Sequence, residues 1–518
     1  MSMDRPTTAI DRARAGYWNA DAYATSGNPG GLDESEDGLT NGLAVNIEPL
    51  LAAVGGMTQW TGEQAAAAGE AATTATAAAG VVASDRAAVL AAKLAAEAAA
   101  GTAVTAAYPL EPDEIAGIPS VLDLVLTDAM ALPAGVFSRL GTATYWDAAG
   151  VLRTAAAGVP RFDHHPVTGR CRGLLIEGAA TNLLLRSQEF DAAAWSKAEV
   201  TVTANAAAAP DGGTAMDKLV ESAANGLHRM SQSVSLVSGQ VYSFSCYARA
   251  GERSVLKLET SGGGWSTAPR VTVNLATGTV QAITGSPTSY GIEPVGGGVF
   301  RCWITATATA TSGLVLLMLG NSASGEAIGY TGDGTSGLYL WGAQLEAGGA
   351  PTSYIATAGG TVTRAADVCA LPTAGWWSAT EGTLVVAWSV AAASAQTIRG
   401  VAALTDGAAD YTALWYWNDG LLYAQVQEAG AISFSVQAAP AYGQRHRAAL
   451  AWAANNAAAS VDGSAPVTDA SVVTTTGVTT LAVGSRGGGG SELNGWIERV
   501  TLLPRRVPDA TLQLLTQG

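Results

Sequence analysis

Sugar binding is the chemistry for which this sequence offers the most candidate residues. Flat aromatic side chains pack on the C–H face of a sugar ring, while amides and carboxylates bond its hydroxyl groups. The chain has 14 Trp and 14 Tyr, and several of them lie in segments that resemble loops or outward strand faces. The predicted sugar-binding residues are Trp265, Tyr290, Trp303, Asn321, Trp376, Trp377, Trp415 and Trp417.

Trp265 is the strongest of these candidates because the glycine-rich stretch Ser261–Gly264 precedes it, and such a loop does not easily bury an indole. The competing interpretation for each candidate is a place in the core, because large aromatic side chains are mostly buried. We prefer that interpretation for Trp388 and Trp452, which lie on the apolar faces of predicted strands.

Catalytic motifs are not recognisable in the sequence. Hydrolysis of a polysaccharide needs two carboxyl groups across a groove, and no such pair stands out. Asp333, between two glycines, is a candidate Ca²⁺ ligand. The stretch Asp163–His165 is predicted to be a surface loop rather than a metal site, because adjacent side chains of an extended segment point in opposite directions. We therefore expect no enzyme activity, no catalytic residue and no cofactor, Ca²⁺ being the one candidate.

The composition argues against several kinds of partner. The formal net charge is −16 and only 14% of the residues are charged. No basic patch is visible, which disfavours nucleic acids and anionic membranes. No segment has the long apolar run of a membrane-spanning helix, and residues 1–20 do not resemble a secretory signal.

Short alternating strands follow one another through most of the chain from Arg161 onwards. In the segment Gln240–Arg249, apolar and polar residues alternate, and Asn418–Gly420 is a strong hairpin signal. This pattern predicts a mainly β fold with two antiparallel β-sandwiches of jelly-roll type. Cys246 and Cys302 are interpreted as small buried residues, with a disulfide between neighbouring strands as the alternative.

The N-terminal part has a different composition. Between Ala65 and Ala100, 20 of the 36 residues are Ala, which favours a helix. A weak heptad pattern of small residues predicts a slender coiled coil, and we expect a homotrimer; the alternative is a flexible linker. The residues before it have mixed polarity and are predicted to be a docking segment, or else a partly ordered tail.

Two groups of motifs resemble a known family. The first comprises Arg161–Asp163, Gly173–Glu177, Thr181–Leu183 and Ser187–Trp195; the second comprises Trp341–Glu346, Ser353–Tyr354 and Thr363–Arg364. Together they resemble the opening and closing patterns of the carbohydrate-binding-like domain of bacteriophage head spikes and tail fibres. The order of elements in residues 375–518 resembles concanavalin-A-like (laminin-G-like) sandwiches. The motifs of the first resemblance are structural in kind rather than catalytic.

These resemblances imply an organisation and a role. The expected parts are a virion-anchoring segment (1–53), a helical stalk (54–107), a transition region (108–160), a carbohydrate-binding-like sandwich (161–368) and a concanavalin-A-like sandwich (375–518). The expected function is recognition of host cell-surface polysaccharide by a fibre or spike of the virion. Such a protein would be made in the host cytoplasm and would bind other virion proteins through its N-terminus. The alternatives are a capsule depolymerase and a purely structural capsid decoration or fibre segment.

Overall fold

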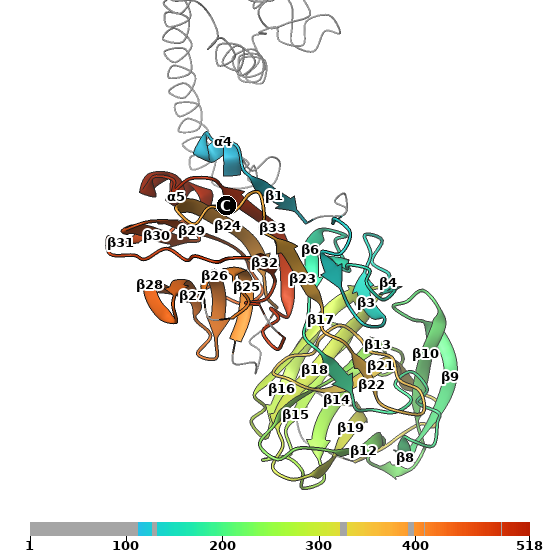
Figure 1. Cartoon of the computed structure of the whole chain (residues 1–518). Coiled ribbons are helices and arrows are strands. Elements are labelled where there is room, and N and C mark those ends of the chain that lie inside the picture. The colour runs from blue at the N-terminus through green and yellow to red at the C-terminus, as the bar shows by residue number, and fades with distance from the viewer. Residues whose placement is uncertain are drawn as a thin grey trace, which may run out of the picture. The chain divides into compact units, whose positions relative to one another are not determined.

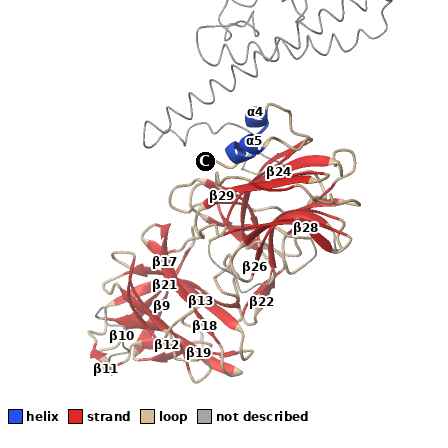
Figure 2. Cartoon of the chain, turned by 90° about the vertical axis from the view of Figure 1, so that its left-hand side faces the viewer, coloured by secondary structure: helices blue, strands red, loops and turns tan. Residues whose placement is uncertain are grey.

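The computed structural model describes residues 112–126, 132–321, 329–391, 398–408, 410–487 and 489–517. They lie in one compact unit, Leu110–Gly518. The predicted anchor and alanine-rich stalk, and with them the predicted trimer, lie outside the described residues. Most of the described chain is β-strand, and its helices are the short α4 (Pro112–Ala116) and α5 (Asp509–Leu515) (Figure 2). The prediction of a mainly β, antiparallel fold is confirmed for this part of the chain.

The first sandwich consists of two six-stranded antiparallel sheets. In spatial order, one sheet contains β17 (Ser289–Gly296), β18 (Val299–Thr307), β13 (Val241–Ala250), β21 (Gly337–Ala347), β10 (Thr214–Glu221) and β9 (Val200–Ala208). The other contains β16 (Thr279–Thr284), β15 (Arg270–Asn274), β14 (Val255–Ser261), β19 (Ser312–Gly320), β12 (Arg229–Ser235) and β8 (Ser196–Ala198).

The second sandwich has sheets of eight and seven strands. The larger contains β31 (Val467–Asp469), β30 (Asn456–Val461), β29 (Arg445–Ala453), β24 (Glu381–Ser389), β33 (Gly495–Leu503), β6 (Cys171–Ile176) and β5 (Phe162–His164), with β1 (Leu122–Val125) also paired to β33. The smaller contains β2 (Phe137–Ser138), β23 (Val368–Pro372), β32 (Thr480–Val483), β25 (Ile398–Thr405), β26 (Tyr411–Trp417), β27 (Leu422–Glu428) and β28 (Ala431–Ala438).

Three two-stranded sheets complete the described strands. They are β3 (Ala143–Trp146) with β4 (Leu152–Ala155), β7 (Ala180–Asn182) with β22 (Val362–Arg364), and β11 (Asn225–Gly226) with β20 (Tyr330–Thr331). Among the described residues, no helix is long and apolar enough to cross a membrane.

Each sandwich has its own core, and the alternating strand patterns account for much of both. Phe244 and Cys246 of β13 are fully buried in the first sandwich, and Trp388 and Trp452 are buried in the second, as predicted. Cys246 and Cys302 lie opposite each other on β13 and β18 and are free thiols. The interpretation as small buried residues is therefore confirmed, and burial raises the pKa of Cys246 to about 12.

β5 and β6 lie in the segment 161–368, which was predicted as the carbohydrate-binding-like sandwich. These strands, together with β1 from the predicted transition region, join the larger sheet of the second sandwich. Figure 1 shows β1 and β6, in blue and cyan, beside the red strand β33. The predicted surface loop Asp163–His165 is also wrong, because Asp163 and His164 are buried in β5. Alternation within a strand identifies its buried face but not the strand with which it pairs.

Candidate functional site

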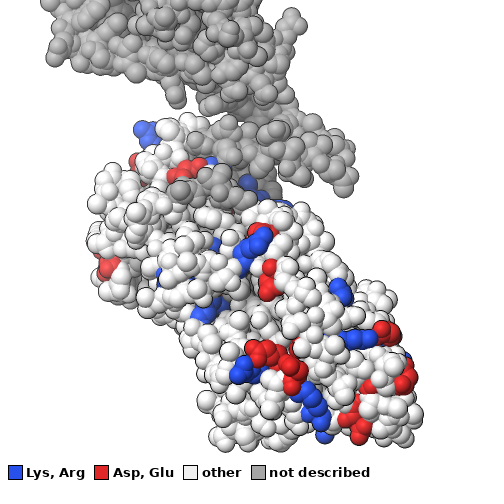
Figure 3. Space-filling view, turned by 90° about the vertical axis from the view of Figure 1, so that its right-hand side faces the viewer, with Lys and Arg blue, Asp and Glu red and all other residues white. Residues whose placement is uncertain are grey.

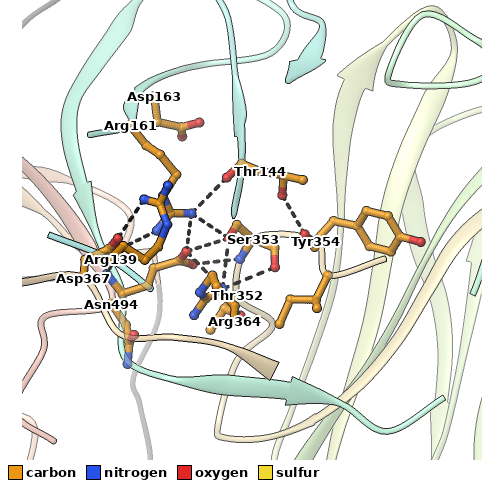
Figure 4. A network of polar contacts seen from close by, with 12 residues as sticks. Arg139, Thr144, Arg161, Asp163, Thr352, Ser353, Tyr354, Arg364, Asp367 and Asn494 are labelled. Carbon is orange, nitrogen blue, oxygen red and sulfur yellow. Dashed lines mark hydrogen bonds and ion pairs between the residues drawn. The ribbon is translucent and has the colours of Figure 1, made fainter. Parts of the chain in front are cut away.

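Arg161, Glu177 and Arg364 of the sequence motifs belong to a buried network of ion pairs that also contains Arg139 and Asp367 (Figure 4). Asp367 lies between Arg139 and Arg161, with ion-pair distances of 3.1 and 2.5 Å, and all three side chains are fully buried. The Asp367 carboxylate also accepts a hydrogen bond from the backbone N–H of Glu177 (2.9 Å). One carboxylate therefore neutralises two cations that are out of contact with water.

Glu177 is the second anion of the network. It lies 2.8 Å from Arg161 and 3.1 Å from Arg364, and it accepts hydrogen bonds from the backbone N–H and the hydroxyl of Ser353. Arg364 donates in turn to the backbone carbonyl of Gly178 (2.6 Å). The network thus ties the chain after β6 to the segment after β21, which are far apart in the sequence.

The closing motif around Trp341–Glu346 is also structural. Glu346 is fully buried and accepts hydrogen bonds from the N–H and hydroxyl of Thr352. Gly342 has φ +61°, and a Cβ there would lie 2.9 Å from the ring of Tyr247, which explains why glycine occupies this position. Four charged residues of the motifs therefore take part in buried contacts that hold the fold together: Arg161, Glu177, Glu346 and Arg364.

A cavity of about 550 Å³ lies beside this network. Both sandwiches and the β3–β4 hairpin contribute to its walls. Tyr247, Glu293 and Arg301 come from the first sandwich, and Asp163, Arg172 and Trp496 come from the larger sheet of the second. The hairpin adds Tyr145 and Trp146. Its size is typical of sites for small ligands, and its walls combine aromatic surface with a few polar groups, as ligand sites do.

Asp163 positions two tryptophans at this cavity. Its carboxylate accepts one hydrogen bond from the backbone N–H of Trp146 (2.7 Å) and one from the indole N–H of Trp496 (2.8 Å). The Trp146 ring packs against Tyr247, with ring centroids 6.3 Å apart. Burial raises the pKa of Asp163 to about 6. The two indoles are half-buried, so each keeps some surface for a ligand.

The contributions of Glu177 and Asp163 to the free energy of unfolding should change with pH in opposite directions, because the pKa of Glu177 is lowered and that of Asp163 is raised. Burial opposes ionisation of Glu177, but the charges of Arg364 and Arg161 outweigh it and lower its pKa to about 2. The stabilisation from Glu177 is therefore present above pH 4.5 and lost as the pH falls towards 2. Because the pKa of Asp163 is raised, its contribution is present below pH 3.8 and lost as the pH rises through 6.

We therefore expect the contribution of Asp163 to raise the melting temperature as the pH falls from about 7 to 5, and that of Glu177 to lower it below about 4.5. Melting curves of the wild type and of Asp163→Asn, followed by circular dichroism, measure this. In the Asp163→Asn variant, the rise in melting temperature near pH 6 should disappear, while the fall in melting temperature below about pH 4.5 should remain. A gain near pH 6 of the same size in both proteins would show that Asp163 is not its source.

The predicted residues of the first sandwich do not gather at one place. Trp265 is only 5% exposed; it packs on Tyr242 and donates its indole N–H to the carbonyl of Leu314 (3.2 Å). The expectation that its indole is exposed is wrong. Gly262 and Gly263 of the turn are exposed, but the indole packs inward against Tyr242 and β19. Tyr290 is 41% exposed and Asn321 is exposed.

Trp303 is half-buried on β18, and its ring covers Gly291 of β17. A Cβ at Gly291 would lie 2.2 Å from the indole, so the missing side chain makes room for it. Trp303 does not line the cavity, although its neighbour Arg301 does. Tyr290 pairs with Ile304, the residue after Trp303, so the two aromatic residues lie on opposite faces of the sheet.

The predicted tryptophans of the second sandwich fall into two groups. Trp376 and Trp377 are partly buried against the core, and Trp377 stacks on Trp452. Trp415 and Trp417 lie on the outer face of the smaller sheet, with ring centroids 5.4 Å apart. Trp415 is 5% exposed and Trp417 is 36% exposed. Trp417 is therefore the more accessible residue of this pair.

The carboxylate of Asp333 is occupied by the turn that contains it. Oδ1 accepts hydrogen bonds from the backbone N–H groups of Thr335 and Ser336 (2.8 and 2.7 Å), and Oδ2 accepts one from the Ser336 hydroxyl. These bonds lower the pKa of Asp333. Within the described residues, no group of three or more His, Cys, Asp or Glu side chains is arranged to hold a metal.

Sequence reasoning missed the cavity residues because they come from strands far apart in the chain. For two of the cavity residues, the sequence contains a local feature that could have drawn attention to them. Arg301 is a charged residue in the middle of an apolar strand pattern, and Trp146 directly precedes the turn that begins at Asp147. A bulky or charged residue at such a place indicates a packed or functional surface, but not the partner that faces it.

Comparison with known proteins finds no matching family model and no curated relative. Similar solved structures include the Ruminococcus gnavus IT-sialidase CBM40 bound to alpha2,3 sialyllactose, at 18% identity over 27% of this chain and 84% of that one, with a TM-score of 0.24. The Limulus polyphemus SAP-like pentraxin is 16% identical over 26% and 69% of the two chains, with a TM-score of 0.20. The mouse laminin alpha1 domains LG4-5 are 10% identical over 64% and 88%, also with a TM-score of 0.20. These similarities are slight and carry no argument about function.

Proposed function

We propose that this chain binds a saccharide, and that the cavity beside the buried network is the binding site. The observation that carries the proposal is the pairing of two half-buried indoles, Trp146 and Trp496, with hydrogen-bonding groups in a cavity of about 550 Å³. A sugar ring can pack on aromatic carbon while its hydroxyl groups bond the polar wall. The buried ion pairs beside the cavity fix its shape before a ligand arrives, which lowers the entropy cost of binding.

Binding rather than hydrolysis is favoured by the state of the cavity carboxylates. Both oxygens of Asp163 already accept hydrogen bonds from N–H donors, and Glu177 is held by two arginines. Neither group is placed as a free acid or base. Glu293 is exposed at the wall, but a hydrolase of the usual kind needs a second available carboxyl group.

The finer part of the proposal is that the chain is a bacteriophage virion fibre or spike that attaches to host surface polysaccharide. Its support is the sequence resemblance described above. In this role, residues 1–53 would anchor the chain to the virion and residues 54–107 would join three copies. Three weak saccharide sites on one stalk gain avidity without any new contact. On the face in Figure 3, most of the described surface is uncharged and the acidic and basic side chains are intermixed, which suits a hydroxyl-rich polymer.

The test is saturable binding of the full chain to an array of bacterial surface polysaccharides, with released reducing ends measured in the same samples. We expect binding without release of reducing ends. Steady release would contradict the proposal and favour a depolymerase. An absence of binding by well-folded protein would contradict it in favour of a purely structural role.

A further inference from the structure

Two arginines line the cavity without a carboxylate partner. The neighbouring Arg139, Arg161 and Arg364 are all ion-paired in the buried network. In contrast, neither Arg172 nor Arg301 forms an ion pair within the described part of the chain, although both line the cavity. This difference matters because a buried or half-buried cation normally has an anion beside it.

Arg301 is the more deeply buried of the two, with 7% of its surface exposed. Its guanidinium donates to the hydroxyl of Ser245 (3.2 Å) and the carbonyl of Thr352 (2.7 Å), both uncharged acceptors. Its Nε is buried and has no hydrogen-bond partner in the described structure. The Nε atoms of Arg161 and Arg364 are likewise buried without a hydrogen-bond partner. Arg301 differs from these two arginines because it lines the cavity and forms no ion pair with the described residues.

Arg172 is held by an aromatic ring instead of an anion. Its guanidinium carbon lies 4.7 Å from the ring centroid of Trp496. Trp496 is itself fixed by its hydrogen bond to Asp163. Stacking uses the flat face of a guanidinium and leaves the N–H groups at its edge, which match the two oxygens of a carboxylate or phosphate.

The acidic groups of the cavity do not satisfy these arginines. Asp163 accepts from Trp146 and Trp496, and Glu177 belongs to the buried network. Glu293 lies opposite Arg301 on β17, but it is exposed and forms no ion pair with either arginine. Asp163 interacts electrostatically with Arg172, but neither Arg172 nor Arg301 has a described carboxylate in ion-pair contact, and both line the cavity that a ligand would enter.

We propose that the saccharide bound in this cavity is anionic, carrying a carboxylate or phosphate group that Arg172 and Arg301 bind. The inference rests on the proposed function, because it specifies the ligand of the same cavity. The sugar ring packs on Trp146, and the anionic group lies towards the arginines. A neutral saccharide would offer these guanidinium groups no charged partner, so it would form only weaker, uncharged hydrogen bonds with them.

The experiment compares bacterial surface polysaccharides in three forms on the array, using the full chain. These are the native polymer, the polymer with its carboxyl groups reduced to alcohols, and the polymer with its phosphates removed by hydrofluoric acid. We expect one of the two treatments to weaken binding about tenfold to a hundredfold, as for a lost charge-assisted hydrogen bond. Reduction should do so if the anionic group is a carboxylate, and dephosphorylation if it is a phosphate. Binding that is equal for all three forms would overturn the inference and leave the proposed function intact, whereas no binding to any form would overturn both.

Variants test the residues directly. Arg172→Gln should weaken binding of the native anionic polymer to the level of its neutral form. Arg170→Gln is the matched control, because Arg170 is exposed two residues away and does not line the cavity. Arg301→Lys keeps the charge and loses the planar set of donors, so it should also weaken binding while its melting temperature reports any damage to the fold. If Arg172→Gln and Arg170→Gln bound the anionic polymer equally well, the assignment would be wrong.

Discussion

Replacing Asp367 with Asn should lower the free energy of unfolding by about 3–5 kcal/mol. The Asp367 carboxylate is the partner of two fully buried arginines, Arg139 and Arg161. Asn has nearly the same shape but no charge, so both guanidinium groups would stay buried with only Glu177 beside one of them. The cost is large because a buried charge that loses its counter-charge cannot recover its hydration. Equilibrium unfolding in urea measures the change.

The matched control is an exposed ion pair of similar geometry. Arg186 and Glu189 lie 2.7 Å apart with side chains 42% and 50% exposed. Glu189→Gln removes the same charge as Asp367→Asn, and it should cost less than about 1 kcal/mol because solvent screens the pair. If the two variants lost equally little stability, the motif network would not be the element that holds the two sandwiches together.

The second large effect concerns binding. Trp146→Ala should weaken saccharide binding by at least about tenfold, because it removes the aromatic surface on which the sugar ring packs and opens the cavity wall. Trp146→Phe keeps a flat ring and should restore most of the affinity. Glycan binding of each variant, measured by titration calorimetry, tests this, with melting temperatures as a check on folding.

Trp417→Ala is the control for this prediction. Trp417 is 36% exposed on the outer face of the smaller sheet and does not line the cavity. Its replacement should leave the affinity within about twofold of the wild type, because an exposed side chain away from the site contributes little. The reverse result, with Trp417→Ala defective and Trp146→Ala unaffected, would move the binding site to that face.

The strands were largely predictable from the sequence because their information is local. The alternation in the segment Gln240–Arg249 corresponds to β13, and the hairpin signal at Asn418–Gly420 lies between β26 and β27. Pairing was not predictable to the same degree. β5 and β6 lie more than 300 residues before β33 yet share its sheet, and nothing in a local pattern specifies such a partner.

The candidate site was even less predictable than the strand pairing, because its residues are brought together from distant parts of the sequence. A prediction based on single aromatic residues selected Trp265, which is buried, and passed over Trp146 and Trp496, which line the cavity. The value of an aromatic side chain for binding depends on what faces it, and here those neighbours come from separate strands. The motif residues were interpreted as structural in kind, and several of them do lie in the buried ion-pair network around Arg161 and Asp367.

The central claim is that an anionic saccharide binds in the cavity. It is tested most directly by a crystal structure of the full chain with a short oligosaccharide, prepared from the polysaccharide that binds most tightly on the array. We expect a sugar ring against Trp146 in the cavity, with its anionic group in contact with the guanidinium groups of Arg172 and Arg301. A saccharide bound elsewhere, for example across Trp417 with the cavity unoccupied, would contradict the account.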